Sequence, residues 1–215
     1  MNIDAAIQRL NTLLPLKQRQ NNLCSELKSL HQAELQSLVN HGRSLQEDEL
    51  KQHITGINID NPLQLLAAED LVVLDKQHKN LVGAYPVTLE QTPHRIVVNG
   101  NTIYAMCALD AVSIAPMFDT YVEIYSRCHV SKEPITIKMQ GSAIVTAHPS
   151  TQIIVGIRWQ TPSNIAAHSM CTEMVFFNDT VNATIWYNQD QKNISLFSLQ
   201  DAATFGKAYF MPLLG

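Results

Sequence analysis

The spacing of hydrophobic residues changes along this chain near residue 86. Before that point leucines recur at near-helical spacing, at Leu23, Leu27, Leu30, Leu35 and Leu38, as on the buried face of a helix. His41-Gly42 ends this segment, and glycine commonly follows the last turn of a helix. Beyond residue 86 the hydrophobic positions form short runs separated by proline and glycine. We therefore expect helices up to about residue 60 and a sheet-rich region after residue 86.

Two further helices are expected in the first part of the chain. Ser44 followed by Glu47 has the spacing of a capping box, in which each side chain accepts a hydrogen bond from a backbone N–H at the first turn of a helix. A helix over 45–54 is therefore predicted, with Ser44 as its cap. Asn61-Pro62 predicts the start of another helix, because proline suits the first helical position.

A hairpin follows these helices. The apolar runs 71–75 and 81–87 are joined by a polar turn, which is the pattern of two paired strands. Helix, turn, helix and hairpin together outline a helical, winged-helix-like domain over residues 1–85.

Residues 86–215 are expected to form a second domain, so that the whole chain is an α+β protein with a mixed or antiparallel sheet core. Asn99-Gly100 between two apolar runs is the strongest hairpin signal in the chain, since both residues tolerate the positive φ of a tight turn. Further strands are predicted at 121–128, 135–139, 142–148, 153–159 and 168–177, with short helices at 108–118 and 199–210.

Composition excludes several classes of protein. The 215 residues are 46% hydrophobic and carry a net charge of −4, as in an ordinary globular protein. No apolar run approaches the roughly 18 residues of a membrane span. Asp4 and Arg9 stand where a signal peptide would be apolar. We therefore expect a cytoplasmic protein, away from membranes, whose four cysteines are reduced.

A winged helix often binds DNA, but the charges argue against that function here. Residues 1–85 carry eight basic and ten acidic residues, and the predicted helix over 62–70 has no Lys or Arg and ends in Glu69-Asp70. Because contacts to phosphates supply most of the affinity for DNA, this face would repel it. We expect no nucleic-acid partner and a packing or lid role for the first domain.

The candidate chemistry lies at Cys107 and Asp110. Cys107 ends an apolar strand and Asp110 falls in the first turn of the helix that follows. Unpaired N–H groups at a helix start stabilise a thiolate, and the carboxyl group can carry a proton. The alternative is that Cys107 is an ordinary buried cysteine and Asp110 a capping residue.

Cys171 is the second candidate thiol. If 168–177 is a strand, alternation displays Cys171 on the same face as Glu173 and Val175, with Met174 on the other face. A regular element would then hold its thiol in place. The alternative is that Cys171 only fills the core.

Several segments resemble one family in the same order and at comparable spacing. They are YAMCALDAVSIAPMF, SRCHVSKEPI, GIRW, HSMCTEMVFF and DAATFGKAYF, within residues 83–212. They resemble the organomercurial (alkylmercury) lyases. The resemblance implies a winged-helix-like first domain, a mixed α/β core, and Cys107, Asp110 and Cys171 as the catalytic residues that also hold mercury.

The implied reaction is protonolysis of a carbon–mercury bond, as in the detoxification of organomercurials. Thiolates are soft ligands that suit mercury, and Asp110 would transfer the released thiol proton to the departing carbon. The products would be a hydrocarbon and Hg²⁺. The resemblance implies no organic cofactor, but an external thiol or mercuric reductase would take up Hg²⁺.

Two departures from the family pattern bear on substrate range rather than on reaction type. Met106 stands where the family frequently has Trp, and Thr172 follows Cys171, so that only one thiol is offered there. Two other functions stay open: a non-catalytic protein that binds Hg²⁺, and a winged-helix regulator that responds to metal. Asp110 argues against the first, because capture needs no proton donor. The absence of basic residues in 62–70 argues against the second.

Overall fold

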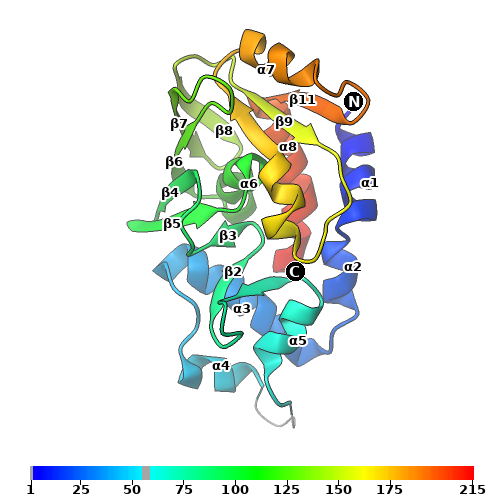
Figure 1. Cartoon of the computed structure of the whole chain (residues 1–215). Coiled ribbons are helices and arrows are strands. Elements are labelled where there is room, and N and C mark those ends of the chain that lie inside the picture. The colour runs from blue at the N-terminus through cyan, green and yellow to red at the C-terminus, as the bar shows by residue number, and fades with distance from the viewer. Residues whose placement is uncertain (1, 55–58) are drawn as a thin grey trace.

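The computed structural model describes residues 2–54 and 59–215, which form helices packed on two antiparallel sheets (Figure 1). The helices are α1 (Ile3–Leu13), α2 (Leu16–Asn21), α3 (Ser25–His41), α4 (Glu47–His53), α5 (Pro62–Ala68), α6 (Ala108–Phe118), α7 (Thr180–Tyr187) and α8 (Leu199–Phe210), with 3₁₀ turns η1 (Ala166–His168), η2 (Met170–Glu173) and η3 (Met211–Leu214). The strands are β1 (Val72–Leu74), β2 (Leu81–Ala84), β3 (Val87–Thr88), β4 (His94–Val98), β5 (Asn101–Ala105), β6 (Tyr121–Arg127), β7 (Pro134–Gln140), β8 (Ala143–His148), β9 (Ile154–Arg158), β10 (Met174–Phe177) and β11 (Ile194–Ser198).

The larger sheet has eight strands in the order β1-β2-β3-β5-β4-β6-β7-β8, and the smaller has the order β10-β9-β11. The α+β prediction is confirmed, with antiparallel pairing throughout these sheets. The predicted hairpin β1–β2 is the edge of the larger sheet, which continues through β3. The sheet thus runs across residue 85 without a break. The domain division and the winged-helix description stay predictions.

Helix α6 occupies the centre of the molecule (Figure 1). Its residues from Ala108 to Met117 are all buried, because α6 packs against α8 on one side and against strands of the larger sheet on the other. The helix begins after Cys107 and ends at Asp119, whose φ of 49° closes it in the left-handed region. The start of this buried helix is where the candidate residues lie.

Several turns form as the sequence predicts. Gly42 follows α3 with φ 66°, and Asn99 and Gly100 adopt φ 50° and 78° between β4 and β5. Both sites have positive φ, which asparagine and glycine adopt at little cost. The helices predicted at 108–118 and 199–210 are α6 and α8.

The predicted cap of α4 is wrong. The capping box is formed by Gln46 and Glu49, while the hydroxyl of Ser44 donates to the buried carboxylate of Glu34 at 2.9 Å. That carboxylate also accepts the N–H of Leu45 at 3.0 Å. The side chain of Ser44 thus bonds to Glu34, ten residues away in the sequence, instead of capping α4 as the local spacing predicted.

The predicted strand over 168–177 is also wrong in its first half. Residues 166–173 form η1 and η2, and β10 begins only at Met174. The hydroxyls of Ser169 and Thr172 donate to the carbonyls of Ile165 and Ser169 at 3.0 and 2.6 Å. These local bonds compete with strand pairing and curl the backbone. Helix α7 and strand β11 were not predicted, and exposed Val181 and Ile185 obscure the pattern of α7.

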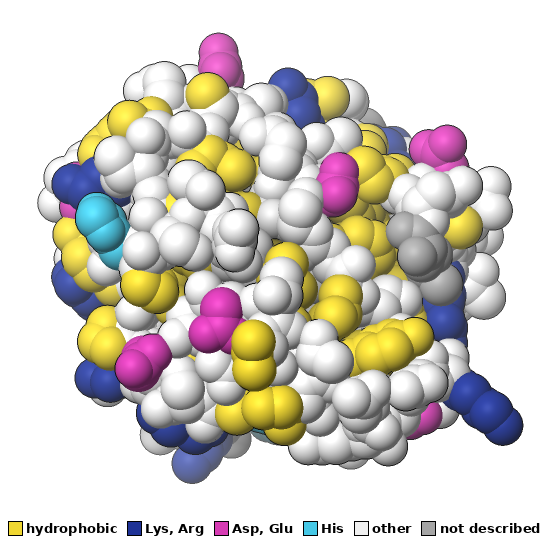
Figure 2. All heavy atoms as spheres, turned by 90° about the horizontal axis from the view of Figure 1, so that it is seen from above, with side chains coloured by type: hydrophobic (Ala, Val, Ile, Leu, Met, Phe, Trp, Pro, Cys, Tyr) yellow, Lys and Arg dark blue, Asp and Glu magenta, His cyan; other side chains and the backbone are white. Residues whose placement is uncertain are grey.

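The surface at the end of the molecule that holds α7 mixes acidic, basic and hydrophobic side chains (Figure 2). On this face no continuous basic area is visible. Among the described residues, no helix has the length and apolar character needed to cross a membrane.

The contact between α6 and α8 yields a first prediction. A Cβ atom at Gly206 of α8 would lie 1.8 Å from the hydroxyl oxygen of Ser113 of α6. Gly206→Ala should therefore push the two helices apart and lower the free energy of unfolding by about 1–3 kcal/mol, measured by urea denaturation.

Thr204→Ala, on the exposed side of α8, is the matched control and should change stability by less than about 0.5 kcal/mol. Adding Ser113→Gly to Gly206→Ala should restore part of the lost stability by making room. Unchanged stability of Gly206→Ala would contradict the close approach of these helices.

Candidate active site

Cys107 is the N-cap of α6. Its backbone is extended, with φ −152° and ψ 179°, and its side chain accepts the N–H of Asp110 at 3.4 Å. A sulfur atom thus fills the role that a Ser or Asp oxygen usually has at the start of a helix. Because β5 ends at Ala105 and α6 begins at Ala108, the thiol is fixed between two rigid elements.

Asp110 lies in the first turn of α6 and is 2% exposed. Among the described residues, its Oδ2 atom has no hydrogen-bond partner. Burial raises the pKa of the Asp110 carboxyl to about 7, and the thiol and backbone of Cys107 oppose that rise. The carboxyl can therefore gain or lose a proton near neutral pH, which is the requirement for a general acid or base.

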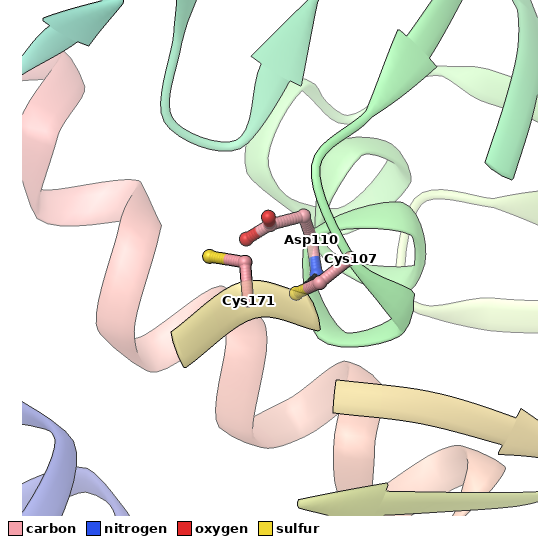
Figure 3. Close-up of side chains that lie close together, drawn as sticks. All are labelled: Cys107, Asp110 and Cys171. Atoms are coloured by element: carbon pink, nitrogen blue, oxygen red, sulfur yellow. Dashed lines mark hydrogen bonds between the residues drawn. The ribbon is translucent and has the colours of Figure 1, made fainter. Parts of the chain in front are cut away.

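Cys171 reaches the same place from η2 (Figure 3). A ligand atom from each of Cys107, Asp110 and Cys171 lies within 4.8 Å of the others, and all three residues are buried. Figure 3 shows the Cys171 sulfur and the Asp110 carboxylate directed into the same space. The structure thus brings together the three residues selected from the sequence.

The two thiols are neutral when the site is empty of substrate. Burial raises the pKa of Cys107 well above its ordinary value, and the Cys171 thiol and the Asp110 charge add to this. The interaction with Cys107 lowers the pKa of Cys171, but burial and the carboxylates of Asp110 and Asp70 together raise it. A thiolate forms here only when a soft cation replaces the proton.

Met174 is a neighbour that the sequence pattern missed. Its thioether sulfur lies 3.6 Å from the Cys107 sulfur, which donates to it. Strand alternation placed Met174 on the face opposite Cys171, but the 3₁₀ turn at 170–173 breaks that alternation. The site therefore holds a third soft sulfur.

A groove of about 440 Å³ leads to Cys171 from the surface. Met106, Met174, Val175 and Phe176 supply its apolar wall, and Arg127 lies among its polar lining residues. Cys107 and Asp110 do not line this groove and are 1% and 2% exposed. An apolar group can thus approach the thiols while the carboxyl stays away from bulk water.

We compared the chain with known proteins to identify the family to which it belongs. The family model of alkylmercury lyase, MerB, matches residues 87–211. The chain belongs to the alkylmercury lyase family. An alkylmercury lyase of Staphylococcus epidermidis is 30% identical over 155 residues, 71% of this chain and 69% of that protein. An alkylmercury lyase of Bacillus cereus is 28% identical over 201 residues, 94% of this chain and 89% of that protein.

The fold agrees with this membership. A crystal structure of the mercury-bound form of MerB2 superposes with a TM-score of 0.76 at 22% identity, over 93% of this chain and 98% of that chain. The resemblance inferred from the sequence motifs to the alkylmercury lyase family is confirmed. The match to the Bacillus cereus protein, over 94% of the chain, extends well beyond the residues that the family model covers.

Burial of Asp110 yields a prediction about stability and pH. In the unfolded chain this carboxyl loses its proton near pH 4, whereas in the folded protein its pKa is about 7. Between these values the folded state binds more protons, so its stability falls as pH rises from about 4 to about 7. Asp110→Asn removes this penalty and should stabilise the protein above pH 7, by at most about 4 kcal/mol.

The measurement is the free energy of unfolding of wild type and Asp110→Asn at pH 5 and pH 8, in the absence of mercury. The advantage of the variant should grow between the two values. Asp48→Asn, which removes an exposed carboxyl from α4, controls for the loss of one charge. An advantage that is the same at both pH values would refute the raised pKa of Asp110.

Proposed function

We propose that this enzyme of the alkylmercury lyase family cleaves the carbon–mercury bond of organomercurials at Cys107, Asp110 and Cys171. The observation that carries the proposal is the approach of two buried sulfurs and a carboxylate to within 4.8 Å. Two thiols alone are enough to bind mercury. The Asp110 carboxyl adds what binding does not need, a proton for the departing carbon. Its Oδ2, which has no partner among the described residues, is available to a reacting group.

The first step exchanges the ligand of mercury. One thiol displaces the water or external thiolate that accompanies the alkylmercury cation R–Hg⁺, so that a sulfur–mercury bond forms as that ligand leaves. The thiol proton passes to the Asp110 carboxylate, or leaves with the displaced ligand or to solvent. The high pKa of the thiols means that mercury, not a local base, drives the loss of the proton. Asp110, whose pKa of about 7 is set by burial, is a suitable proton carrier at neutral pH.

The second step breaks the bond. The other thiol loses its proton, to solvent if Asp110 already carries the first proton and to Asp110 if it does not, and adds to mercury as a thiolate. This raises the electron density on mercury and weakens the bond to carbon. The bonding electron pair stays with carbon, which takes the proton from Asp110 and leaves as R–H. Mercury remains Hg²⁺ on the Cys107 and Cys171 thiolates, so no oxidant or reductant takes part.

This chemistry needs no organic cofactor. Release of Hg²⁺ from two thiolates needs an acceptor, either a low-molecular-weight thiol or a thiol of mercuric reductase, because only soft ligands compete with thiolates. A cytoplasmic location suits this exchange, since the cytosol keeps thiols reduced. Support comes from the four cysteines, all within the described residues, none of which forms a disulfide.

The test is benzene release from phenylmercury in excess thiol. Cys107→Ser, Cys171→Ser and Asp110→Ala should each lower kcat at least about 100-fold, because each removes a group that touches the reacting atoms. Cys24→Ser, at an exposed cysteine, is the matched control and should keep wild-type activity.

Two results would overturn the proposal. Stoichiometric uptake of phenylmercury by wild type without benzene would favour capture over cleavage. Full activity of Cys107→Ser would leave the reaction intact and refute the site.

The groove supports a prediction about the organic group. Val175 is 8% exposed and lines the groove beside Cys171. Val175→Phe should narrow the groove and lower kcat/KM for phenylmercury about tenfold, whereas kcat/KM for methylmercury should change by less than about threefold. Val145→Phe, at an exposed position of β8, is the control. Equal loss for both substrates would show that the organic group binds elsewhere.

A further inference from the structure

The turn that carries Cys171 is held by a carboxylate and a phenol from the N-terminal part of the chain. Asp70 follows α5, and Tyr85 follows β2. The N–H of Ala166 donates to Asp70 Oδ2 at 3.2 Å. The N–H of Ala167 donates to the Tyr85 hydroxyl at 2.9 Å. Two successive backbone amides at the start of η1 are thus bonded to side chains about 80–100 residues earlier in the chain.

The two side chains form one unit. The Tyr85 hydroxyl donates to Asp70 Oδ1 at 2.9 Å, so each oxygen of the carboxylate has its own partner. Arg19 of α2 donates to Asp70 Oδ2 at 3.4 Å and to the carbonyl of Glu69 at 3.1 Å. Tyr85 is 1% exposed and the Asp70 side chain 14%, with Arg19 at the more open end, and a hydrogen-bonded network largely shielded from water is rigid when its members are all bonded.

This unit lies close to the candidate site. Its partners Ala166 and Ala167 lie on the turn that carries Cys171. Burial raises the pKa of the Tyr85 hydroxyl, and the charges of Cys171 and Asp70 add to this. Yet neither side chain donates a hydrogen bond to the sulfur among those that the structure gives to the described residues. They act on the backbone of η1, four to five residues before Cys171, rather than on the thiol.

The turn needs such an anchor because it has little regular structure of its own. Only short 3₁₀ turns span residues 166–173. The hydrogen bonds of Ser169 reach back no further than Gln160, and an ion pair with Arg158 holds Glu173 at the far end of the turn. The start of the turn is held by Asp70 and Tyr85. Cys107 and Asp110, in contrast, are fixed by the buried helix α6. The distance between the two thiols therefore depends on where η1 is held.

We infer that Tyr85 and Asp70 are positioning residues, which hold the η1–η2 turn so that the Cys171 sulfur can reach mercury bound at Cys107. This inference rests on the proposed function. It gives the N-terminal region a role in catalysis: α2 and α5 fix the second thiol through Arg19, Asp70 and Tyr85. A misplacement of about 1 Å is enough to slow an enzyme about 100-fold.

Tyr85→Phe tests the inference, because it keeps the buried ring and removes both hydrogen bonds of the hydroxyl. With phenylmercury and excess thiol, kcat for benzene release should fall about tenfold or more, and KM should stay within about twofold, because the mercurial still reaches Cys107. Tyr125→Phe is the matched control: its hydroxyl also donates to a carboxylate, that of Glu123, but on a strand away from η1. Its kcat should stay within about twofold of wild type.

Asp70→Asn separates positioning from charge. Loss of the negative charge lowers the pKa of Cys171 and would favour its thiolate, so an electrostatic role predicts equal or higher activity. Positioning predicts a lower kcat, because the amide group cannot accept from both Tyr85 and Ala166 as the carboxylate does. The double variant should be no more than about threefold slower than the slower single variant, since both act on one turn.

A second measurement does not depend on turnover. Each variant is titrated with Hg²⁺ against a competing dithiol, and retention of Hg²⁺ should be about tenfold weaker in Tyr85→Phe than in wild type or Tyr125→Phe. Equal retention and equal kcat in Tyr85→Phe would overturn the inference, as would a kcat loss matched by Tyr125→Phe. If wild type released no benzene, the proposed function would be refuted. If Tyr85→Phe nevertheless retained Hg²⁺ less well than wild type, the positioning role of Tyr85 and Asp70 would still be supported.

Discussion

The burial of α6 is the constraint on which the rest of the site depends. The helix lies between the larger sheet and α8, and its residues from Ala108 to Met117 are inside the protein. Its first turn therefore carries Cys107 and Asp110 into a place that water does not reach. Burial raises the pKa values of both groups. The same packing that stabilises the fold thus keeps the thiol protonated and brings the carboxyl to a pKa near neutral.

The two thiols are held by different kinds of structure. Cys107 is fixed locally, by a strand that ends and a helix that begins within three residues. Cys171 is fixed at long range, because its turn is bonded to Asp70 and Tyr85. Local rigidity and a long-range anchor must agree for both sulfurs to meet one ion.

Local patterns in the sequence predict those parts of the molecule that local interactions form. The hairpin at Asn99-Gly100, the helix after Cys107 and the glycine that ends α3 all follow from the preferences of a few neighbouring residues. The prediction failed where a distant partner or a side-chain bond overrides the pattern, as at Ser44 and in the turn before β10. The three site residues were found by their chemistry and by family resemblance. Met174 and Tyr85 were not, because their roles follow from contacts over 67 and 82 residues of chain.

In the proposed reaction, a neutral, buried pair of thiols would favour a soft cation. Hard cations need anionic oxygen ligands and gain little from protonated sulfur. In the proposed reaction mercury replaces the thiol proton, which Asp110 can then hold, because its pKa is about 7. The acid needed for the second step is thus generated by the first. The two thiols keep their protons until the substrate arrives, so that in the proposed reaction burial favours a cation that displaces thiol protons.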